Sequence, residues 1–138
     1  MILLDTNVLS ALMQQAPDPR VVSWLDRQPR ASIWTTAVTV LEIRYGLQIL
    51  ATGRRRAFLT EAFDILLDKL GHRIAAFDAE AAAHAATLMA ERRHEGRPVD
   101  LRDTMIAGIA RARRSALATR NTPHFADAGI ALVNPWSA

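Results

Sequence analysis

Short apolar runs alternate along the chain with longer stretches in which apolar residues recur every three or four positions. A short apolar run that stops abruptly is typical of a buried parallel strand, and the three-to-four spacing is typical of an amphipathic helix. Strands are predicted at residues 1–5, 31–35, 73–77, 116–119 and 130–133. Helices are predicted at residues 6–13, 20–27, 37–52, 55–69, 79–95 and 101–114, with a turn or short helix at 122–126. The alternation predicts an α/β sandwich around a mainly parallel sheet, in a single domain that spans residues 1–138.

Polar residues precede several predicted helices and are suited to cap them. Thr6 or Asn7 is expected to cap the first helix, and Thr36 the helix of residues 37–52. Asp78 is expected to cap the Ala-rich helix that follows the third strand. Proline and glycine mark most of the remaining breaks, at Pro17, Pro19, Pro29, Gly53, Gly71, Gly96 and Pro98.

The composition is that of an ordinary globular domain, with half of the residues apolar and 22% charged. The chain has no cysteine, which excludes disulfides, thiolate metal sites and a cysteine nucleophile. No apolar run approaches the ~20 residues that cross a bilayer, and the N-terminus lacks the basic region of a signal peptide. We therefore expect a cytoplasmic protein with no membrane partner.

The formal net charge is +3, and sixteen of the seventeen basic residues are arginine. Arginine suits phosphate because its planar fork binds two oxygens at once, but a GC-rich genome also produces such a composition. Two arginine clusters, at 54–56 and 111–114, could guide RNA phosphates. The alternative is that both are solvated helix ends that favour the helix dipole. Trp34 and Trp136 could stack on bases, although packing in the core or at an interface is the preferred interpretation.

Asp5 ends the first predicted strand. Functional groups of parallel sheets collect beyond the carboxyl ends of the strands, so Asp5 is a candidate site residue. Its alternative role is to cap the helix that follows it. A single aspartate at this position leaves both interpretations open.

Glu42 lies inside the helix predicted at residues 37–52. Its neighbours at helical spacing form a largely apolar face, namely Val38, Thr39, Tyr45, Gly46 and Ile49. We therefore expect Glu42 to face the protein, where an ionised carboxylate needs a partner. Arg44 is two residues away and points elsewhere. A metal ion is the preferred partner, and a salt bridge to a distant arginine is the alternative.

Asp100 and Asp103 stand at the start of the helix predicted at residues 101–114. An Asp-x-x-Asp pair begins helices naturally, and we assign Asp100 mainly a capping role. Asp103 continues the buried stripe of this helix by one turn and is expected to point into a shared pocket. Asn121 follows the fourth strand, and its amide oxygen suits a hard cation or a bound water. A turn-forming asparagine is the alternative.

Asp5, Glu42, Asp103 and Asn121 thus bring oxygen donors to the ends of four separate elements. Oxygen donors suit Mg²⁺ or Mn²⁺, which keep several of their waters when bound to protein. Such an ion polarises a phosphoryl oxygen and supplies a hydroxide-like nucleophile at neutral pH. The residues therefore predict in-line hydrolysis of a phosphodiester.

Five short motifs follow one another along the chain: ILLDTN at residues 2–7, TVLEIRYG at 39–46, DTMIA at 103–107, TRN at 119–121 and NPW at 134–136. Each motif is weak alone. In this order and with these gaps they resemble the PIN-domain toxins of the VapC type and the related FitB branch. The resemblance covers nearly the whole chain.

The resemblance implies a three-layer α/β/α fold and an Mg²⁺- or Mn²⁺-dependent endoribonuclease. By the family motifs, Asp5, Glu42 and Asp103 are the catalytic residues, and Asp5 and Asp103 hold the metal. Asn121 stands where the family often has a fourth acid or an amide, and Asp100 is a second accessory candidate. The resemblance also implies a homodimer, an RNA substrate and a small antitoxin whose tail fills the active-site groove and whose other end binds operator DNA.

The chain departs from the family pattern at His124, where an aspartate commonly precedes the phenylalanine. We transfer no role to His124, and Asp127 could compensate for the missing acid. A haloacid-dehalogenase-type phosphatase would need a second aspartate where Asn7 stands, and a phospho-acceptor receiver domain would need an acidic neighbour for Asp5. The remaining alternative is a catalytically weak nucleic-acid-binding module that acts with a small DNA-binding partner, as the FitB resemblance indicates. A pure binding module has no physical reason to keep three inward-facing acids.

Overall fold

The computed structural model describes residues 1–98 and 100–138, and at its centre is a five-stranded sheet in the order β3-β2-β1-β4-β5. Every pair of neighbouring strands is parallel. The strands are β1 (Ile2–Leu4), β2 (Ile33–Thr36), β3 (Ile74–Ala75), β4 (Ala116–Ala118) and β5 (Leu132–Val133). The prediction of an α/β protein with a parallel sheet is confirmed.

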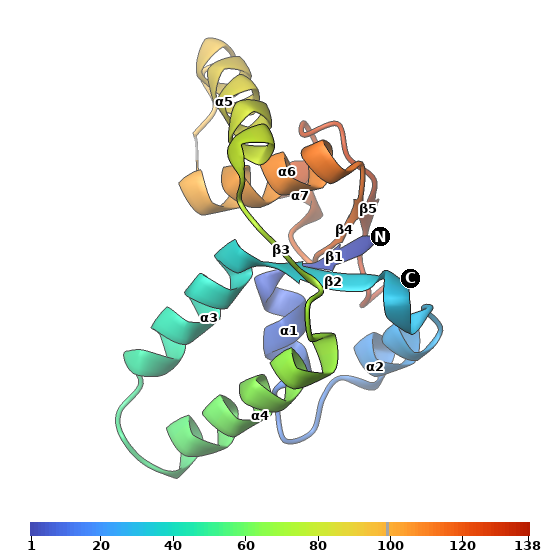
Figure 1. The fold of residues 1–138 in the computed structure, drawn as a ribbon, viewed down its shortest axis with the longest axis vertical. Helices are drawn as coiled ribbons and strands as arrows, with labels where there is room; N and C mark the ends of the chain where they lie inside the picture. The colour runs from blue at the N-terminus through green and yellow to red at the C-terminus, as the bar shows by residue number, and fades with distance from the viewer. Residues whose placement is uncertain (99) are drawn as a thin grey trace.

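Helices cover both faces of this sheet, so the predicted three layers are present (Figure 1). Four helices lie on one side: α1 (Thr6–Leu12), α2 (Pro19–Asp26), α3 (Ala37–Gln48) and α4 (Arg54–Leu70). Three lie on the other: α5 (Ala79–His94), α6 (Leu101–Arg113) and α7 (Thr122–Phe125). Among the described residues, no helix combines the length and the apolar character needed to span a membrane.

Each face of the sheet has its own apolar core, because successive strand residues point to opposite faces. Leu4 and Ala118 belong to the cluster that α1, α2, α3 and α4 cover, in which Phe63 is fully buried. Leu3 and Leu117 belong to the cluster that α5 and α6 cover. Two adjacent strands therefore supply side chains to both cores, which places the sheet firmly between the helical layers.

Several predicted boundaries are shifted in the structure. Asp5, rather than Thr6 or Asn7, caps α1 through its side chain, which accepts the Thr6 backbone N–H. The strand expected at 31–35 begins only at residue 33, because Arg30–Ser32 forms a 3-10 turn. The helix expected at 37–52 ends at Gln48, four residues early. Thr36, Asp78 and Asp100 cap their helices as predicted.

The strand order creates a crevice at the carboxyl end of the sheet. The chain runs outward from β1 through β2 to β3, and then returns to the opposite side of β1 to form β4 and β5. Connections that leave the central strands in opposite directions open a crevice beyond their carboxyl ends, where ligands of α/β proteins bind. Asp5 follows β1 and Thr119 follows β4, so both lie at this point.

Candidate active site

A hollow of about 930 Å³ lies at the carboxyl end of the sheet. It brings together four of the five predicted site residues: Asp5, Glu42, Asp103 and Asn121. Asp100 instead lines a neighbouring depression of about 430 Å³. The other residues that line the large hollow are Thr6, Asn7, Ser10, Ala11, Gln14, Ala16, Pro17, Asp18, Pro19, Arg120 and Trp136.

Asp5 is the most buried acid of the hollow, with 4% of its surface exposed. Its Oδ1 accepts the Thr6 backbone N–H at 2.8 Å, which is the helix-capping bond. Its Oδ2 accepts the Thr119 hydroxyl at 2.7 Å and the Asn7 amide at 3.2 Å. Both roles considered for Asp5 are therefore present in the structure, since it caps α1 and also lines the hollow.

Burial raises the pKa of Asp5 above its usual range. The hydrogen bonds from Thr119 and from the Thr6 backbone act in the opposite direction and lower this pKa, while the negative charge of Asp103 raises it. The raised value means that these hydrogen bonds do not fully replace the lost hydration. A cation beside Asp5 would favour its ionised form.

Glu42 extends from α3 toward α1. Its Oε1 accepts the Thr6 hydroxyl at 2.9 Å, and 18% of its side chain is exposed. Burial raises the pKa of Glu42, the Thr6 hydrogen bond and Arg102 lower it, and Asp5 and Asp103 raise it. The alternative partner, a distant arginine, is present as Arg102, but its Nε lies 3.7 Å from Oε2 and its side chain is half exposed. This loose pair leaves Glu42 close to two other carboxylates.

The apolar face predicted around Glu42 is buried over only part of its length. Val38 and Thr39 are buried as expected, but Tyr45 and Ile49 are 59% and 66% exposed. The sequence pattern cannot separate an apolar face that packs inside the domain from one that lies on the surface, because both have the same spacing.

Asp103 enters the hollow from the first turn of α6, where 22% of its side chain is exposed. Its backbone N–H donates to the Asp100 side chain at 3.0 Å, so Asp100 has the capping role that we assigned to it. The Oδ2 of Asp103 lies 3.1 Å from the Nδ1 of His124. Sequence reasoning gave His124 no role, and the structure places it directly against a candidate metal ligand.

Three residues that sequence reasoning missed hold these acids in place. Thr6 bonds Glu42, and Thr119 bonds Asp5. The Asn7 side chain donates to Asp5 and accepts the Arg120 backbone N–H at 3.0 Å. Two of the motifs, ILLDTN and TRN, already contained this signal, since their polar residues follow the ends of the adjacent strands β1 and β4.

Asn121 lines the hollow, but its side chain is exposed and makes no capping hydrogen bond to α7. Its backbone N–H donates to the Thr119 hydroxyl at 3.0 Å. The same hydroxyl donates to Asp5, so the Asn121 backbone is joined to the acidic centre by one side chain. The Asn121 carbonyl also accepts the His124 backbone N–H at 3.0 Å, so Asn121 lines the hollow and begins the turn that leads into α7.

Asp127 does not compensate for the missing acid at position 124, and that interpretation is wrong. The guanidinium of Arg92 binds both of its carboxylate oxygens, at 2.9 Å each. Arg92 is 5% exposed, and it also donates to the Thr104 hydroxyl and to the His124 carbonyl. The hydrogen bond from Arg92 lowers the pKa of Asp127. This pair fixes the turn that bears His124, beside the hollow rather than inside it.

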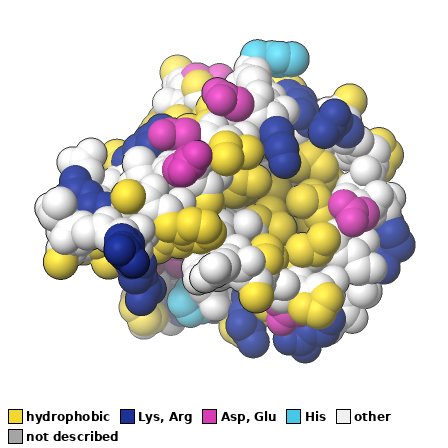
Figure 2. Space-filling view, turned by 90° about the horizontal axis from the view of Figure 1, so that it is seen from below, with side chains coloured by type: hydrophobic (Ala, Val, Ile, Leu, Met, Phe, Trp, Pro, Cys, Tyr) yellow, Lys and Arg dark blue, Asp and Glu magenta, His cyan; other side chains and the backbone are white. Residues whose placement is uncertain are grey.

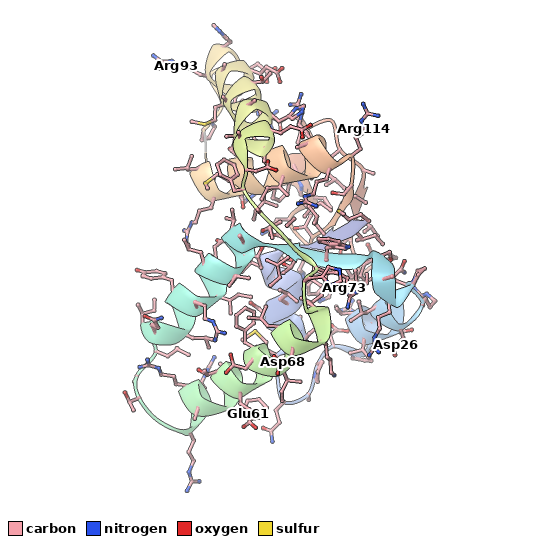
Figure 3. The ribbon with its side chains drawn as sticks, in the orientation of Figure 1. Asp26, Glu61, Asp68, Arg73, Arg93 and Arg114 are labelled. Carbon is pink, nitrogen blue, oxygen red and sulfur yellow. The ribbon has the colours of Figure 1, made fainter. Side chains whose placement is uncertain are left out.

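The arginine clusters lie at opposite ends of their helices. Arg113 and Arg114 end α6, where a positive charge favours the dipole, and Figure 3 shows Arg114 pointing away from the sheet. Arg54, Arg55 and Arg56 begin α4, and Arg54 and Arg55 are exposed, so this cluster is a solvated helix end as the alternative held. The favourable interaction with the dipole is wrong for it, because positive charge is disfavoured at the start of a helix.

The two tryptophans pack as preferred, Trp34 against the core under α5 and α6 and Trp136 against the core on the other side of the sheet. An arginine lies over each ring.

Among residues 1–98 and 100–138, no three acidic or histidine side chains are close enough together to form a ready-made metal cluster. The donors that line the hollow are carboxylate, amide and hydroxyl oxygens, which are the ligands of hard cations. Mg²⁺ is commonly held by one or two carboxylates and several waters. These donors fit an Mg²⁺ ion that is bound by two carboxylates and completes its coordination with water. They do not surround the ion with protein ligands alone.

Comparisons with known proteins agree with this fold. The PIN domain family matches residues 2–130. The "VapC ribonuclease Y4jK" of Sinorhizobium fredii is 37% identical over 99% of this chain and 98% of its own length. "Toxin FitB" of Neisseria gonorrhoeae is 36% identical over 99% of both chains. In the solved structure of FitAB bound to the IR36 DNA fragment, a chain with 36% identity superposes with a TM-score of 0.89, over 99% of this chain and 96% of that one.

The parallel sheet, the acids at its carboxyl end and these full-length matches define the class of the protein, a domain of the PIN type. The chain belongs to the PIN-domain family, in the group that contains VapC and FitB.

Proposed function

We propose that the protein is the toxin of a toxin–antitoxin pair and that it hydrolyses RNA phosphodiester bonds with the help of Mg²⁺ or Mn²⁺. One observation carries this proposal: three carboxylates from three separate elements face one hollow, and burial and mutual repulsion raise the pKa of two of them. Carboxylates gathered in this way are costly without a cation. The ribonuclease name of the relative from Sinorhizobium fredii supports the same chemistry.

Asp5 and Asp103 are the residues that would hold the cation, with Asn121 as a neutral oxygen donor beside them. When bound, the cation polarises a phosphoryl oxygen and generates a strong nucleophile at neutral pH. In this proposal Glu42 would accept the proton of the attacking water. Its raised pKa suits that role, because a base works best when its pKa approaches the working pH. Thr6 orients Glu42 through its hydroxyl.

The partner in the proposal is a small antitoxin, and the similarity to a chain of the solved FitAB structure supports it. A second hollow, of about 440 Å³, lies between α1, α2 and α4 and is floored by hydrophobic side chains (Figure 2). Asp26, Arg30, Lys69 and Arg73 line its rim, and Figure 3 marks two of them, Asp26 and Arg73. An amphipathic antitoxin segment with charged flanks suits this surface. Pro17 lines both hollows, so the same segment can continue into the active site, while the antitoxin's other end binds operator DNA.

A homodimer completes the proposal. Leu41, Tyr45 and Ile49 form an exposed apolar stripe on α3, with 59%, 59% and 66% of their surfaces accessible. Large apolar side chains clustered on one face mark protein interfaces. A second copy is the proposed occupant of this stripe. We place the protein's action in the cytoplasm, because RNA is its proposed substrate and the chain has no cysteine to pair in an oxidising compartment.

The test is cleavage of a mixed pool of single-stranded RNA by the purified protein with Mn²⁺ or Mg²⁺. Asp5→Asn, Asp103→Asn and addition of EDTA serve as controls. Cleavage that is lost in all three controls supports a metal-dependent nuclease at this hollow. Cleavage that survives in Asp5→Asn would locate the reaction elsewhere.

The second candidate function is a nucleic-acid-binding module with little activity of its own. The DNA-bound FitAB structure favours it, as does the open arrangement of the acids among the described residues. RNA or DNA binding without cleavage under every metal would overturn the nuclease proposal and support this candidate.

A further inference from the structure

Arg120 and Trp136 form a stacked pair that lines the active-site hollow. The guanidinium carbon of Arg120 lies 4.9 Å from the centre of the Trp136 ring, and both residues line the same hollow as Asp5 and Asp103. Arg120 is exposed, whereas Trp136 is partly buried and packs against the core beneath α1 and α2. The tryptophan therefore supports a flat cationic surface that faces solvent.

Asn7 joins this pair directly to the catalytic acid. Its Oδ1 accepts the Arg120 backbone N–H at 3.0 Å, and its Nδ2 donates to Asp5 Oδ2 at 3.2 Å. One short side chain thus spans the distance between the Asp5 carboxylate and the Arg120 backbone. Trp136 is held in turn by its own backbone N–H, which donates to the Asn134 side chain at 2.9 Å. The Arg120 backbone is therefore held close to the Asp5 carboxylate, and the Trp136 backbone is held by Asn134.

The charges around the hollow leave the Arg120 guanidinium available to a ligand. Asp18 also lines the hollow, but Arg20 binds both of its oxygens, at 2.8 to 3.1 Å. These hydrogen bonds are the main cause that lowers the pKa of Asp18 to about 2, and the charge of Arg120 makes a smaller contribution. In the part of the chain that the structure describes, no hydrogen bond or ion pair involves the Arg120 guanidinium. Arg120 is the one basic residue among those that line the hollow, beside four acids. An anionic substrate entering this hollow would meet its positive charge here.

We propose that the Arg120–Trp136 pair is a nucleotide subsite that binds an unpaired RNA nucleotide next to the scissile phosphate. The base stacks on the outer face of the guanidinium, and the edge of the guanidinium donates to a backbone phosphate. Unpaired bases stack in this way on arginine planes and aromatic rings, and the contact does not require a particular base. The inference rests on the proposed nuclease function, and it names the residues that would bind the nucleotide beside the cleaved bond.

The chain offers a matched control for this pair. Arg113 lies over Trp34 at 5.4 Å in the same kind of stack, but neither residue lines the active-site hollow. Arg120→Ala and Arg113→Ala each remove one positive charge and one contact with a tryptophan ring. The two variants therefore differ only in where the lost arginine lies. Any loss of RNA binding that comes from net charge alone appears equally in both variants.

The experiment measures binding of a fluorescein-labelled single-stranded oligoribonucleotide by anisotropy, in EDTA and at fixed salt, so that no cleavage occurs. Arg120→Ala is expected to weaken binding about tenfold, since a base stack contributes on that scale, and Arg113→Ala less than about twofold. Trp136→Phe keeps an aromatic ring beneath Arg120, so it is expected to lose less RNA-binding affinity than Arg120→Ala. Thermal unfolding of each variant shows whether it remains folded.

The outcomes separate this inference from the proposed function. Equal losses in Arg120→Ala and Arg113→Ala, or an equal effect of Arg120→Ala on double-stranded RNA, would overturn the subsite even if the unmutated protein cleaves RNA. Absence of oligonucleotide binding by the unmutated protein would overturn it as well. If only Arg120→Ala loses RNA binding, the result supports the subsite even when no metal yields cleavage. In that case only the nuclease proposal would be overturned.

Discussion

Thr119 donates its hydroxyl proton to Asp5 Oδ2 across 2.7 Å, and this bond links the ends of two adjacent strands, β4 and β1. Both residues are almost fully buried, at 0% and 4% exposure. A buried carboxylate depends on such donors, and removing one leaves the charge partly unsatisfied. The pair therefore connects the stability of the sheet to the state of the candidate active site.

Thr119→Val is expected to lower the free energy of unfolding by about 1.5–3 kcal/mol, the range for a hydrogen bond to a charged group. It is also expected to raise the pKa of Asp5 further, since the Thr119 hydrogen bond lowers it. Urea denaturation and NMR titration of the Asp5 carboxyl measure the two effects. Thr119→Ser keeps the hydroxyl and serves as the control. An Asp5 pKa that does not rise in Thr119→Val would contradict this prediction.

Mn²⁺ is expected to stabilise the protein, by about 2.7 kcal/mol at a hundred times its dissociation constant. The effect should grow with pH, because the pKa values of Asp5 and Glu42 are raised and protons compete with the cation for their oxygens. Without metal, the contribution of Asp5 to stability falls as the pH rises from its ordinary value of 3.8 through its raised value. Thermal unfolding with and without Mn²⁺ between pH 4 and 8 measures this dependence.

Asp103→Asn is expected to remove most of the stabilisation by Mn²⁺ if Asp5 and Asp103 hold the ion. His124→Ala, which removes a neighbour of Asp103 without removing an acid, should keep a clear response to Mn²⁺. A response in Asp103→Asn equal to that of the unmutated protein would place the cation elsewhere.

Asp127→Asn is expected to lower the free energy of unfolding by about 1.5–3 kcal/mol at pH 7, because it removes the charged partner of the buried Arg92. The pKa of Asp127 is lowered in the folded protein, so its contribution is complete above the ordinary aspartate value of 3.8. That contribution is lost as the pH falls through the lowered value, so the difference between the two proteins should shrink below pH 4. Urea denaturation at pH 7 and pH 3 measures it.

Asp18→Asn is the control for that prediction. The pKa of Asp18 is also lowered, to about 2, but its ion pair with Arg20 is exposed to solvent, which screens it. Asparagine also retains the capping function at the start of α2. Asp18→Asn should therefore destabilise the protein less than Asp127→Asn. The reverse order would contradict the assignment of Arg92–Asp127 as the structural pair.

Gly108→Ala is expected to destabilise the protein by about 1–3 kcal/mol, the range for overpacking a close contact. An added Cβ at this position in α6 would lie 2.5 Å from the Ala81 carbonyl oxygen and 2.8 Å from the Ala85 Cβ, both on α5. Gly46→Ala in α3 is the opposite case, since no atom lies within 4 Å of an added Cβ. It should stabilise by roughly 0.5–1 kcal/mol through helix propensity. Equal thermal shifts in the two variants would contradict the close approach of α5 and α6.

Tyr45→Glu is expected to convert the proposed homodimer into a monomer, because it places a charge in the exposed stripe on α3. Met89→Glu is the control, since Met89 is also exposed and lies on α5, in the opposite helical layer. Light scattering measures the mass of each variant. A monomeric unmutated protein, or a Tyr45→Glu variant that remains dimeric, would contradict the proposed interface.

The alternation of apolar runs and amphipathic stretches was enough to predict the parallel α/β fold, because strands and helices place apolar residues at different spacings along the sequence. The motifs also identified Asp5, Glu42 and Asp103 as residues that meet in one place, and they do line one hollow. Asp100 was recognised as a cap because capping depends on a contact only three residues away. These features depend on local order along the chain, or on a strong family pattern.

The remaining assignments depended on contacts between distant residues. Asp127 stands near the site in sequence, but only folding brings Arg92, thirty-five positions away, to occupy its carboxylate. Asp5 and Glu42 accept hydrogen bonds from threonine hydroxyls, and nothing in the composition marks these threonines as different from others. Part of the apolar face of α3 lies on the surface of the protein. The sequence alone determined which elements form and which acids gather. The tertiary structure decided which of these charges are neutralised by protein and which remain available to a ligand, because that depends on which side chains meet across the folded chain.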